Sequence, residues 1–338
     1  MRSIISFAVG FLLCCAPTLG LAAPFEATHS LLQKKADPTK VGYLAIYWKT
    51  DETGVFFALS DNDDPLAFTE INGGEPIFVP TLGQQTVRDV SLVPGNGDDT
   101  ATKWYIVATD LNIDDYASWD AASANGSKSM LIWDSTDLVN WTDERLITVE
   151  NDTAGMVWAP DAIWDASEGK YLVHWASKFF AEDDTSHSEG AVTSTMIRYA
   201  HTTDFQTFTT ANTYIDLSPD DVIDLSFLKI NDTAHVRFYV NGGVLTDVGY
   251  DGLFGAWERV GDLITGYEGP YPFWDNVVDN EAYLINDLVG GDAGIRGFGP
   301  SDPTTGVFAQ DTSVDLSFMR HGSVLALTQE QYDALAAL

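Results

Sequence analysis

The sequence predicts an all-β protein built as a β-propeller. Short runs of β-branched and aromatic residues recur along the chain, and clusters of Gly, Asn, Asp and Ser separate them. Helical periodicity is scarce, and a degenerate repeat of about 70 residues divides the chain. Such a repeat suits four-stranded blades, and the chain after residue 23 has room for four to five of them.

The expected strands and the one expected helix follow from local composition. Strand-like runs occupy residues 43–48, 104–108, 130–133, 171–175 and 236–240. Residues 329–338 alone have the pattern of a helix, with Thr328 as its N-cap.

The repeat is carried by turns of similar sequence that follow strands. Residues 60–68, 135–141 and 202–208 each place a Ser or Thr before an Asp, and an aromatic residue closes each turn. The closing residues Phe68, Trp141 and Phe208 lie 73 and 67 residues apart. The alternative is an ordinary β-sandwich in which the three turns resemble one another by coincidence.

The N-terminus predicts secretion. Residues 1–23 contain the charged residue Arg2, an apolar stretch and a small-residue end, as a secretory signal peptide does, which leaves 24–338 as the mature domain. Both cysteines, Cys14 and Cys15, fall inside this segment, so the mature chain has no disulfide or thiolate site. Glycosylation triplets begin at Asn125, Asn140, Asn151 and Asn231.

The charge balance excludes two classes of partner. Fifty Asp and Glu face 17 Lys and Arg, which gives a formal net charge of −33. Such a surface repels nucleic acid and anionic membranes. A hydrophobic fraction of 45% is too high for a disordered acidic chain. We expect a folded, secreted monomer.

Four acidic residues interrupt apolar or aromatic stretches, where a carboxylate needs a partner or a purpose. The innermost strands of a propeller line its central channel, so carboxylates from several blades converge at its mouth. One protonated and one ionised carboxyl group among aromatic walls suit hydrolysis of a glycosidic bond. The four residues are Asp89, Asp161, Asp224 and Glu268.

The chain resembles glycoside hydrolase family 43. Residues 88–91 (RDVS), 158–161 (WAPD) and 267–270 (YEGP) are similar, in this order, to its three catalytic segments. Residues 135–141, 175–178 and 320–324 resemble intervening segments, and the resemblance runs from about residue 43 to 328. It implies a single-domain propeller of five blades and hydrolysis with inversion at the anomeric carbon.

The resemblance also implies roles for individual residues. Asp89 would be the general base and Glu268 the general acid, while Asp161 would orient Glu268 and raise its pKa. No cofactor or metal is expected to be required, although the resemblance allows a calcium ion near His321. The implied substrate is an arabinose- or xylose-containing oligo- or polysaccharide of the plant cell wall. The substrate-binding candidates are Trp158, Asp224, His321 and Arg296.

Several alternatives stay open at this point. Asp161 and Glu268 could be structural turn acids, Asp89 could pair with Arg88, and His321 could be a core histidine. Val90 replaces the usual proline of the base segment, and residues 236–262 depart from the family pattern. A non-catalytic sugar-binding propeller is therefore one rival, and a retaining fructosidase on a similar propeller is another.

Overall fold

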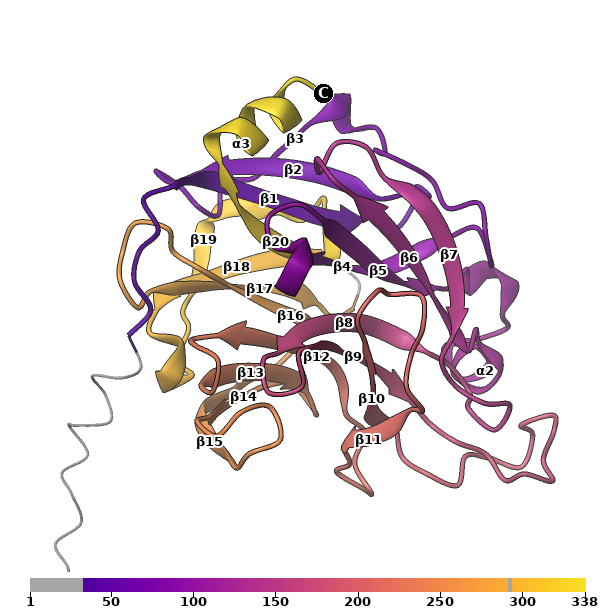
Figure 1. Cartoon of the computed structure of the whole chain (residues 1–338). Helices are drawn as coiled ribbons and strands as arrows, with labels where there is room; N and C mark the ends of the chain where they lie inside the picture. The colour runs from indigo at the N-terminus through magenta and orange to yellow at the C-terminus, as the bar shows by residue number, and fades with distance from the viewer. Residues whose placement is uncertain (1–32, 291–293) are drawn as a thin grey trace, which may run out of the picture. The chain divides into compact units, whose positions relative to one another are not determined.

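Five four-stranded antiparallel sheets contain all the strands of the described residues (Figure 1). The computed structural model describes residues 33–290 and 294–338, and the signal peptide expected at 1–23 lies outside them. Residues 33–338 form one compact unit. The predicted all-β, five-bladed propeller is confirmed, and each sheet is one blade.

The blades follow one another along the chain, except that the last strand joins the first blade. Blade 1 contains β1 (Lys40–Trp48), β2 (Phe56–Asp61), β3 (Thr69–Glu70) and β20 (Arg320–Thr328); blade 2 contains β4 (Val87–Pro94), β5 (Trp104–Asp110), β6 (Ser129–Ser135) and β7 (Thr142–Thr148); blade 3 contains β8 (Trp158–Asp165), β9 (Lys170–Ser177), β10 (Met196–Thr202) and β11 (Asn212–Ile215); blade 4 contains β12 (Ile223–Lys229), β13 (His235–Val240), β14 (Val244–Gly249) and β15 (Trp257–Ile264); blade 5 contains β16 (Tyr267–Trp274), β17 (Ala282–Leu288), β18 (Ile295–Ser301) and β19 (Gln310–Leu316).

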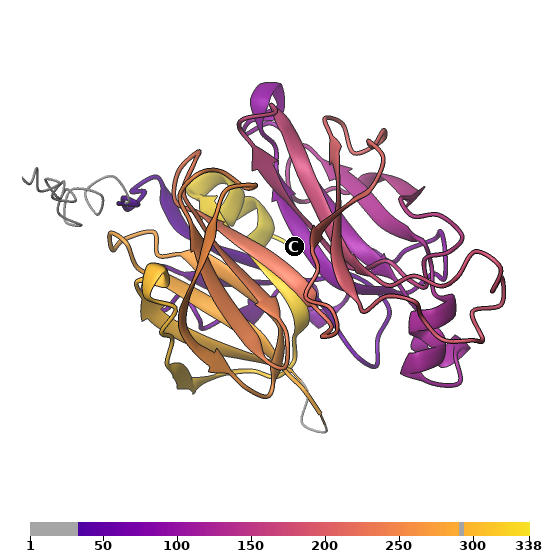
Figure 2. The same cartoon turned by 90° about the horizontal axis from the view of Figure 1, so that it is seen from below.

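The innermost strands close into a ring around the central channel. They are β20, β4, β8, β12 and β16, and each contacts the innermost strands of both neighbouring blades. Strand β20 pairs with β1, so residues from the two ends of the domain share one sheet. Figure 1 labels these strands, and Figure 2 shows the blades from a second direction.

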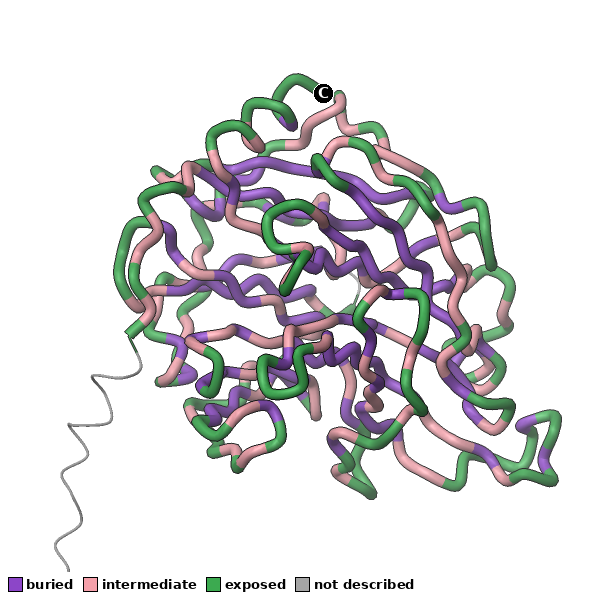
Figure 3. Tube along the Cα trace, viewed as in Figure 1, coloured by how far each residue is buried: buried purple, intermediate pink, exposed green. Residues whose placement is uncertain are grey.

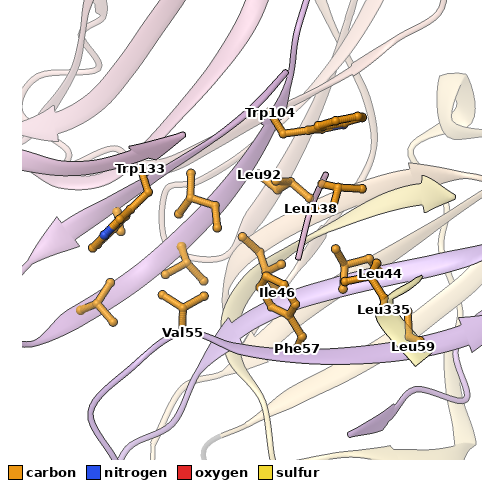
Figure 4. Packing of buried hydrophobic residues seen from close by; sticks show 14 of the residues in the cluster. Leu44, Ile46, Val55, Phe57, Leu59, Leu92, Trp104, Trp133, Leu138 and Leu335 are labelled. Carbon is orange, nitrogen blue, oxygen red and sulfur yellow. The ribbon is translucent and has the colours of Figure 1, made fainter. Parts of the chain in front are cut away.

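Apolar side chains fill the space between adjacent blades. In the layer between blades 1 and 2, Ile46 and Phe57 pack against Leu92 and Trp104 (Figure 4). The strands nearest the channel are mostly buried, whereas turns and outer edges are exposed (Figure 3). Burial of β-branched and aromatic faces on both sides of each sheet explains the near-continuous apolar runs in the sequence.

The repeated turns all occupy the same place, between the third and fourth strands of blades 1, 2 and 3. In blade 2 the Ser135 hydroxyl accepts a hydrogen bond from the amide of Leu138 at 2.9 Å, and the Asp137 carboxylate accepts from Asn140. Thr202 and Asp204 form the matching bonds in blade 3. The polar side chains satisfy the turn's backbone donors, so the residue that follows the Asp can be buried.

Two further sequence expectations are settled by the fold. Helix α3 (Gln329–Ala336) begins after Thr328, which forms a capping box with Gln331. Residues 236–262, which depart from the family pattern, still complete blade 4. The other helix, α2 (Trp119–Asn125), and four short 3-10 turns, at Asn72–Gly74, Gly97–Asp99, Ile113–Asp115 and Pro303–Thr305, lie in connections. Within the described residues, no helix is long and apolar enough to cross a membrane.

Candidate active site

Each innermost strand begins with an irregularity in its pairing, and the site is built from these irregularities. The pairing register of β4 shifts between Arg88 and Ser91, and equivalent shifts occur in the other four blades. Asp89 and Asp224 sit in these bulges with φ of 47° and 54°. A bulge redirects a side chain out of the regular alternation, and here it turns carboxylates toward the channel.

The bulges surround a cleft of about 540 Å³ at one end of the channel. It is lined by charged residues from four blades and by aromatic side chains. The charged residues are Arg88, Asp89, Asp224, Glu268, Asp287, Arg320 and His321; the tryptophans are Trp48, Trp119 and Trp158. Asp89 and Glu268 come from different blades and line the same cleft, as the sequence predicts.

Asp89 is held in its ionised form. Burial alone would raise the pKa of this carboxyl group, but the hydrogen bond from His321 and the charges of His321 and Arg88 outweigh burial and lower it. The Asp89 Oδ1 to His321 Nδ1 distance is 3.3 Å. An ionised carboxylate at the cleft surface can accept a proton from water.

His321 connects the carboxylates of the site. Burial would lower the pKa of the imidazole, yet Asp89, Asp224 and Asp287 together raise it to about 9. Asp287 is 1% exposed, accepts a hydrogen bond from the backbone amide of His321 at 3.2 Å and pairs with Arg320 at 2.7 Å. His321 is therefore a charged residue of the site.

Glu268 differs from Asp89 in its protonation. Burial, followed by the negative charges of Asp224 and Asp287, raises the pKa of Glu268 to about 7. The Asp224 carboxylate accepts a hydrogen bond from the amide of Gly269, the residue after Glu268, at 2.9 Å. Position 269 requires glycine, because its φ is 54° and a Cβ would lie 2.6 Å from the His321 ring.

Asp161 does not line this cleft. It lies in the small space beneath, where Ser91 donates a hydrogen bond to its carboxylate and burial raises its pKa to about 6. Its bulge places Ala159, rather than an acid, at the position equivalent to Asp89 and Asp224. The acidic residue of the cleft that acts on Glu268 most strongly is Asp224. The expectation that Asp161 performs this task therefore has no support in the geometry.

Of the expected substrate-binding residues, Trp158, Asp224 and His321 line the cleft and Arg296 does not. Arg296 lies on β18 and donates hydrogen bonds to the carbonyl oxygens of Gly294 and Ile295. Sequence reasoning assigned no site role to five other charged or aromatic residues of the cleft. Asp287 could have been found, because it interrupts the apolar run of β17 as the other acids interrupt theirs; the remaining four are Trp48, Arg88, Trp119 and Arg320.

Metal binding is not indicated by the donor set. Among residues 33–290 and 294–338, no three His, Cys, Asp or Glu side chains are grouped so as to hold a metal ion. A protonated imidazole offers no lone pair to a metal, so His321 in its charged form is a poor cation ligand. A calcium ion near His321 stays a prediction.

Comparison with known proteins places the chain in a family. A family profile described as "Probable glycosyl hydrolase domain", related to glycoside hydrolase family 43, matches residues 37–333. An α-L-arabinofuranosidase of Bifidobacterium longum subsp. longum is 30% identical over 181 residues, which cover 50% of this chain and 17% of that protein. The match therefore spans less than a fifth of the length of this relative.

Solved structures give weaker similarity. An exo-β-1,3-galactanase from Phanerochaete chrysosporium is 14% identical with a TM-score of 0.48, over 80% of this chain and 54% of that one. The catalytic domain of a family 62 α-L-arabinofuranosidase from Coprinopsis cinerea is 14% identical with a TM-score of 0.46, over 73% and 75%. TM-scores below 0.5 give no argument about the substrate. By the profile match over nearly the whole described domain, the chain belongs to the glycoside hydrolases related to family 43.

Proposed function

We propose that this protein is a secreted glycosidase that releases arabinofuranosyl or xylosyl units with inversion at the anomeric carbon. One observation carries the proposal: the cleft presents two carboxyl groups whose surroundings move their pKa values in opposite directions. Asp89 has a lowered pKa, whereas the pKa of Glu268 is about 7. This separation is the requirement for paired acid and base catalysis at one pH.

In the proposed reaction Asp89 removes a proton from water as the water oxygen bonds to the anomeric carbon. Glu268 gives its proton to the leaving glycosidic oxygen as the bond from that oxygen to the anomeric carbon breaks. One proton enters Asp89 and one leaves Glu268, so exchange with solvent restores the site. Inversion predicts that the two carboxyl groups lie about 6.5–9.5 Å apart, which leaves room for the water.

Asp224 takes the role that the sequence assigned to Asp161. Its charge opposes ionisation of Glu268, and its bond to the Gly269 amide fixes the backbone beside the acid. Asp224 therefore acts through Glu268 and is a positioning residue.

The assignment of arabinose or xylose rests on similarity to other proteins and on the aromatic lining of the cleft. The relative from Bifidobacterium longum is named an α-L-arabinofuranosidase, and the resemblance to family 43 implies arabinose or xylose. The exposed Trp119 and the half-buried Trp158 suit stacking on sugar faces. Secretion is proposed from residues 1–23 and from glycosylation triplets whose Asn125, Asn140 and Asn151 are exposed.

A product assay on arabinan, arabinoxylan, xylo-oligosaccharides and β-1,3-galactan tests the function. We expect arabinose or xylose, and proton NMR of the first product should show the anomeric configuration opposite to that of the substrate. Glu268→Gln and Asp89→Asn are the matched inactive variants. Retention of configuration would exclude the mechanism, release of galactose alone would exclude the sugar assignment, and binding without turnover would identify a non-catalytic propeller.

A further inference from the structure

Arg88 occupies an unusual place in the cleft. It directly precedes Asp89, and its guanidinium carbon lies 3.9 Å from the ring centroid of Trp48 and 5.0 Å from that of Trp119. The two tryptophans thus hold the guanidinium by cation–π attraction. Such a clamp fixes the side chain but leaves the edge of the guanidinium, where its donors lie, unused.

The donors of Arg88 have no partner in the described part of the chain. Its guanidinium forms no ion pair or hydrogen bond there, although the charges of Asp89, Arg320 and Glu268 act on it at longer range. Five other arginines are each paired with a carboxylate: Arg145, Arg198, Arg237, Arg259 and Arg320. In a protein with 50 acidic residues, an arginine without an acidic partner stands out.

The charge of the cleft differs from that of the whole protein. Four acidic residues line it, but Arg88, Arg320 and the protonated His321 oppose them. Arg320 is bound by Asp287 and His321 by Asp89, so Arg88 is the cation of this lining that can engage a ligand.

We infer that Arg88 binds the carboxylate of a uronic acid carried by the glycan next to the bond that is cleaved. Guanidinium and carboxylate match in a two-bond, charge-assisted pair, and the edge of Arg88 is free for it. Trp119, which is 52% exposed, would then contact the apolar face of the same sugar. This inference rests on the proposed function and adds an acidic substituent to the substrate class.

Direct binding tests the inference without turnover. We would titrate Glu268→Gln protein by calorimetry with an aldotetraouronic acid, which is xylotriose bearing glucuronate, and with its carboxyl-reduced analogue. The acid should bind roughly 10–100-fold more tightly, as a hydrogen bond to a charged group predicts. Adding Arg88→Gln should abolish this preference, and Arg88→Lys should retain part of it. Lys128→Gln, which removes one positive charge outside the cleft, should retain the full preference.

Equal affinity of the acid and the reduced analogue would overturn the inference, and this comparison needs no Arg88 variant that must fold. Equal loss of the preference in the Arg88 and Lys128 variants would also overturn it, since net charge would then explain the preference. Turnover of neutral aryl arabinosides and xylosides by the parent protein reports the proposed function separately. Turnover without a preference for the acid refutes the inference alone, whereas an Arg88-dependent preference without turnover refutes the glycosidase.

Discussion

Replacing Asp224 by Asn should lower the pH at which the enzyme loses activity. The basic limb of the pH profile of kcat/KM reports ionisation of the general acid, and the pKa of Glu268 is about 7. Among the charged neighbours of Glu268, Asp224 raises this pKa most. Asparagine keeps an oxygen that can accept the hydrogen bond from Gly269 but carries no charge. The variant therefore isolates the electrostatic effect.

The size of the effect follows from the pKa. At pH 7 about half of Glu268 is protonated in the parent enzyme, as expected for a pKa equal to the pH. Removal of a neighbouring negative charge should lower the pKa of Glu268, and with it the basic limb, by about one unit. Roughly a tenth of Glu268 is then protonated at pH 7. Activity at pH 7, relative to the acidic plateau of each protein, should therefore fall about 5-fold.

The assay measures kcat/KM from pH 4 to pH 9 on an oligosaccharide without an aryl leaving group. Asp161→Asn is the matched control. Asp161 also changes from carboxylate to amide in this control, but it lies outside the cleft and is not among the main groups that shift the pKa of Glu268. The basic limb of the pH profile of Asp161→Asn should lie at the same pH as that of the parent enzyme. If Asp161→Asn moves the limb and Asp224→Asn does not, the assignment of the positioning residue is wrong.

Four further results are expected. Glu268→Gln should lower turnover about 10²–10⁴-fold on substrates with poor leaving groups and far less on aryl glycosides, and equal losses in parallel rate measurements would contradict its role as acid. Asp89→Asn should impair both substrate types by a similar factor, so a mild effect on either would reassign the base. His174 is fully buried without a hydrogen-bond partner and has a pKa of about 3, so the folded protein loses stability as the pH falls below 6.5, where the unfolded chain binds a proton. Between pH 7 and pH 4, the free energy of unfolding in urea should therefore fall by about 3 kcal/mol less in His174→Leu than in the parent protein. Equal losses in the two proteins would refute this. Thr328→Ala should destabilise the protein by about 1 kcal/mol through loss of the cap of α3, which thermal unfolding measures against exposed Thr136→Ala.

The sequence alone predicts a propeller because blades 1 to 3 repeat similar strand and turn sequences. Apolar runs give strands, and the Ser/Thr and Asp turns at 135–141 and 202–208 mark equivalent corners, so a propeller follows from local signals. The number of blades came from resemblance, since blades 4 and 5 lack a clear copy of the turn. The pairing of β20 with β1 is a long-range contact that no local pattern reports.

The site was predictable in part for a related reason. Acids that interrupt apolar strands identify residues near the channel, and Asp89, Asp224 and Glu268 were found in this way. Depth along the channel is set by where each bulge falls, which the spacing of residues does not show; Asp161 was misplaced for this reason. For Arg88 the sequence offered only the alternative of a pair with Asp89, because the contact of Arg88 with Trp48 joins strands of different blades.

The pairing of β20 with β1 has a consequence for how the protein is made. During synthesis, blade 1 has only three strands until residues 320–328 leave the ribosome, and the ring cannot close before then. The same segment brings Arg320 and His321, which neutralise the carboxylates of the cleft. Closure of the ring and charge compensation in the cleft thus both depend on this one long-range pairing, which favours slow folding. We expect a chain clipped before this strand to lack glycosidase activity, because neither the ring nor the charge balance of the cleft would be complete.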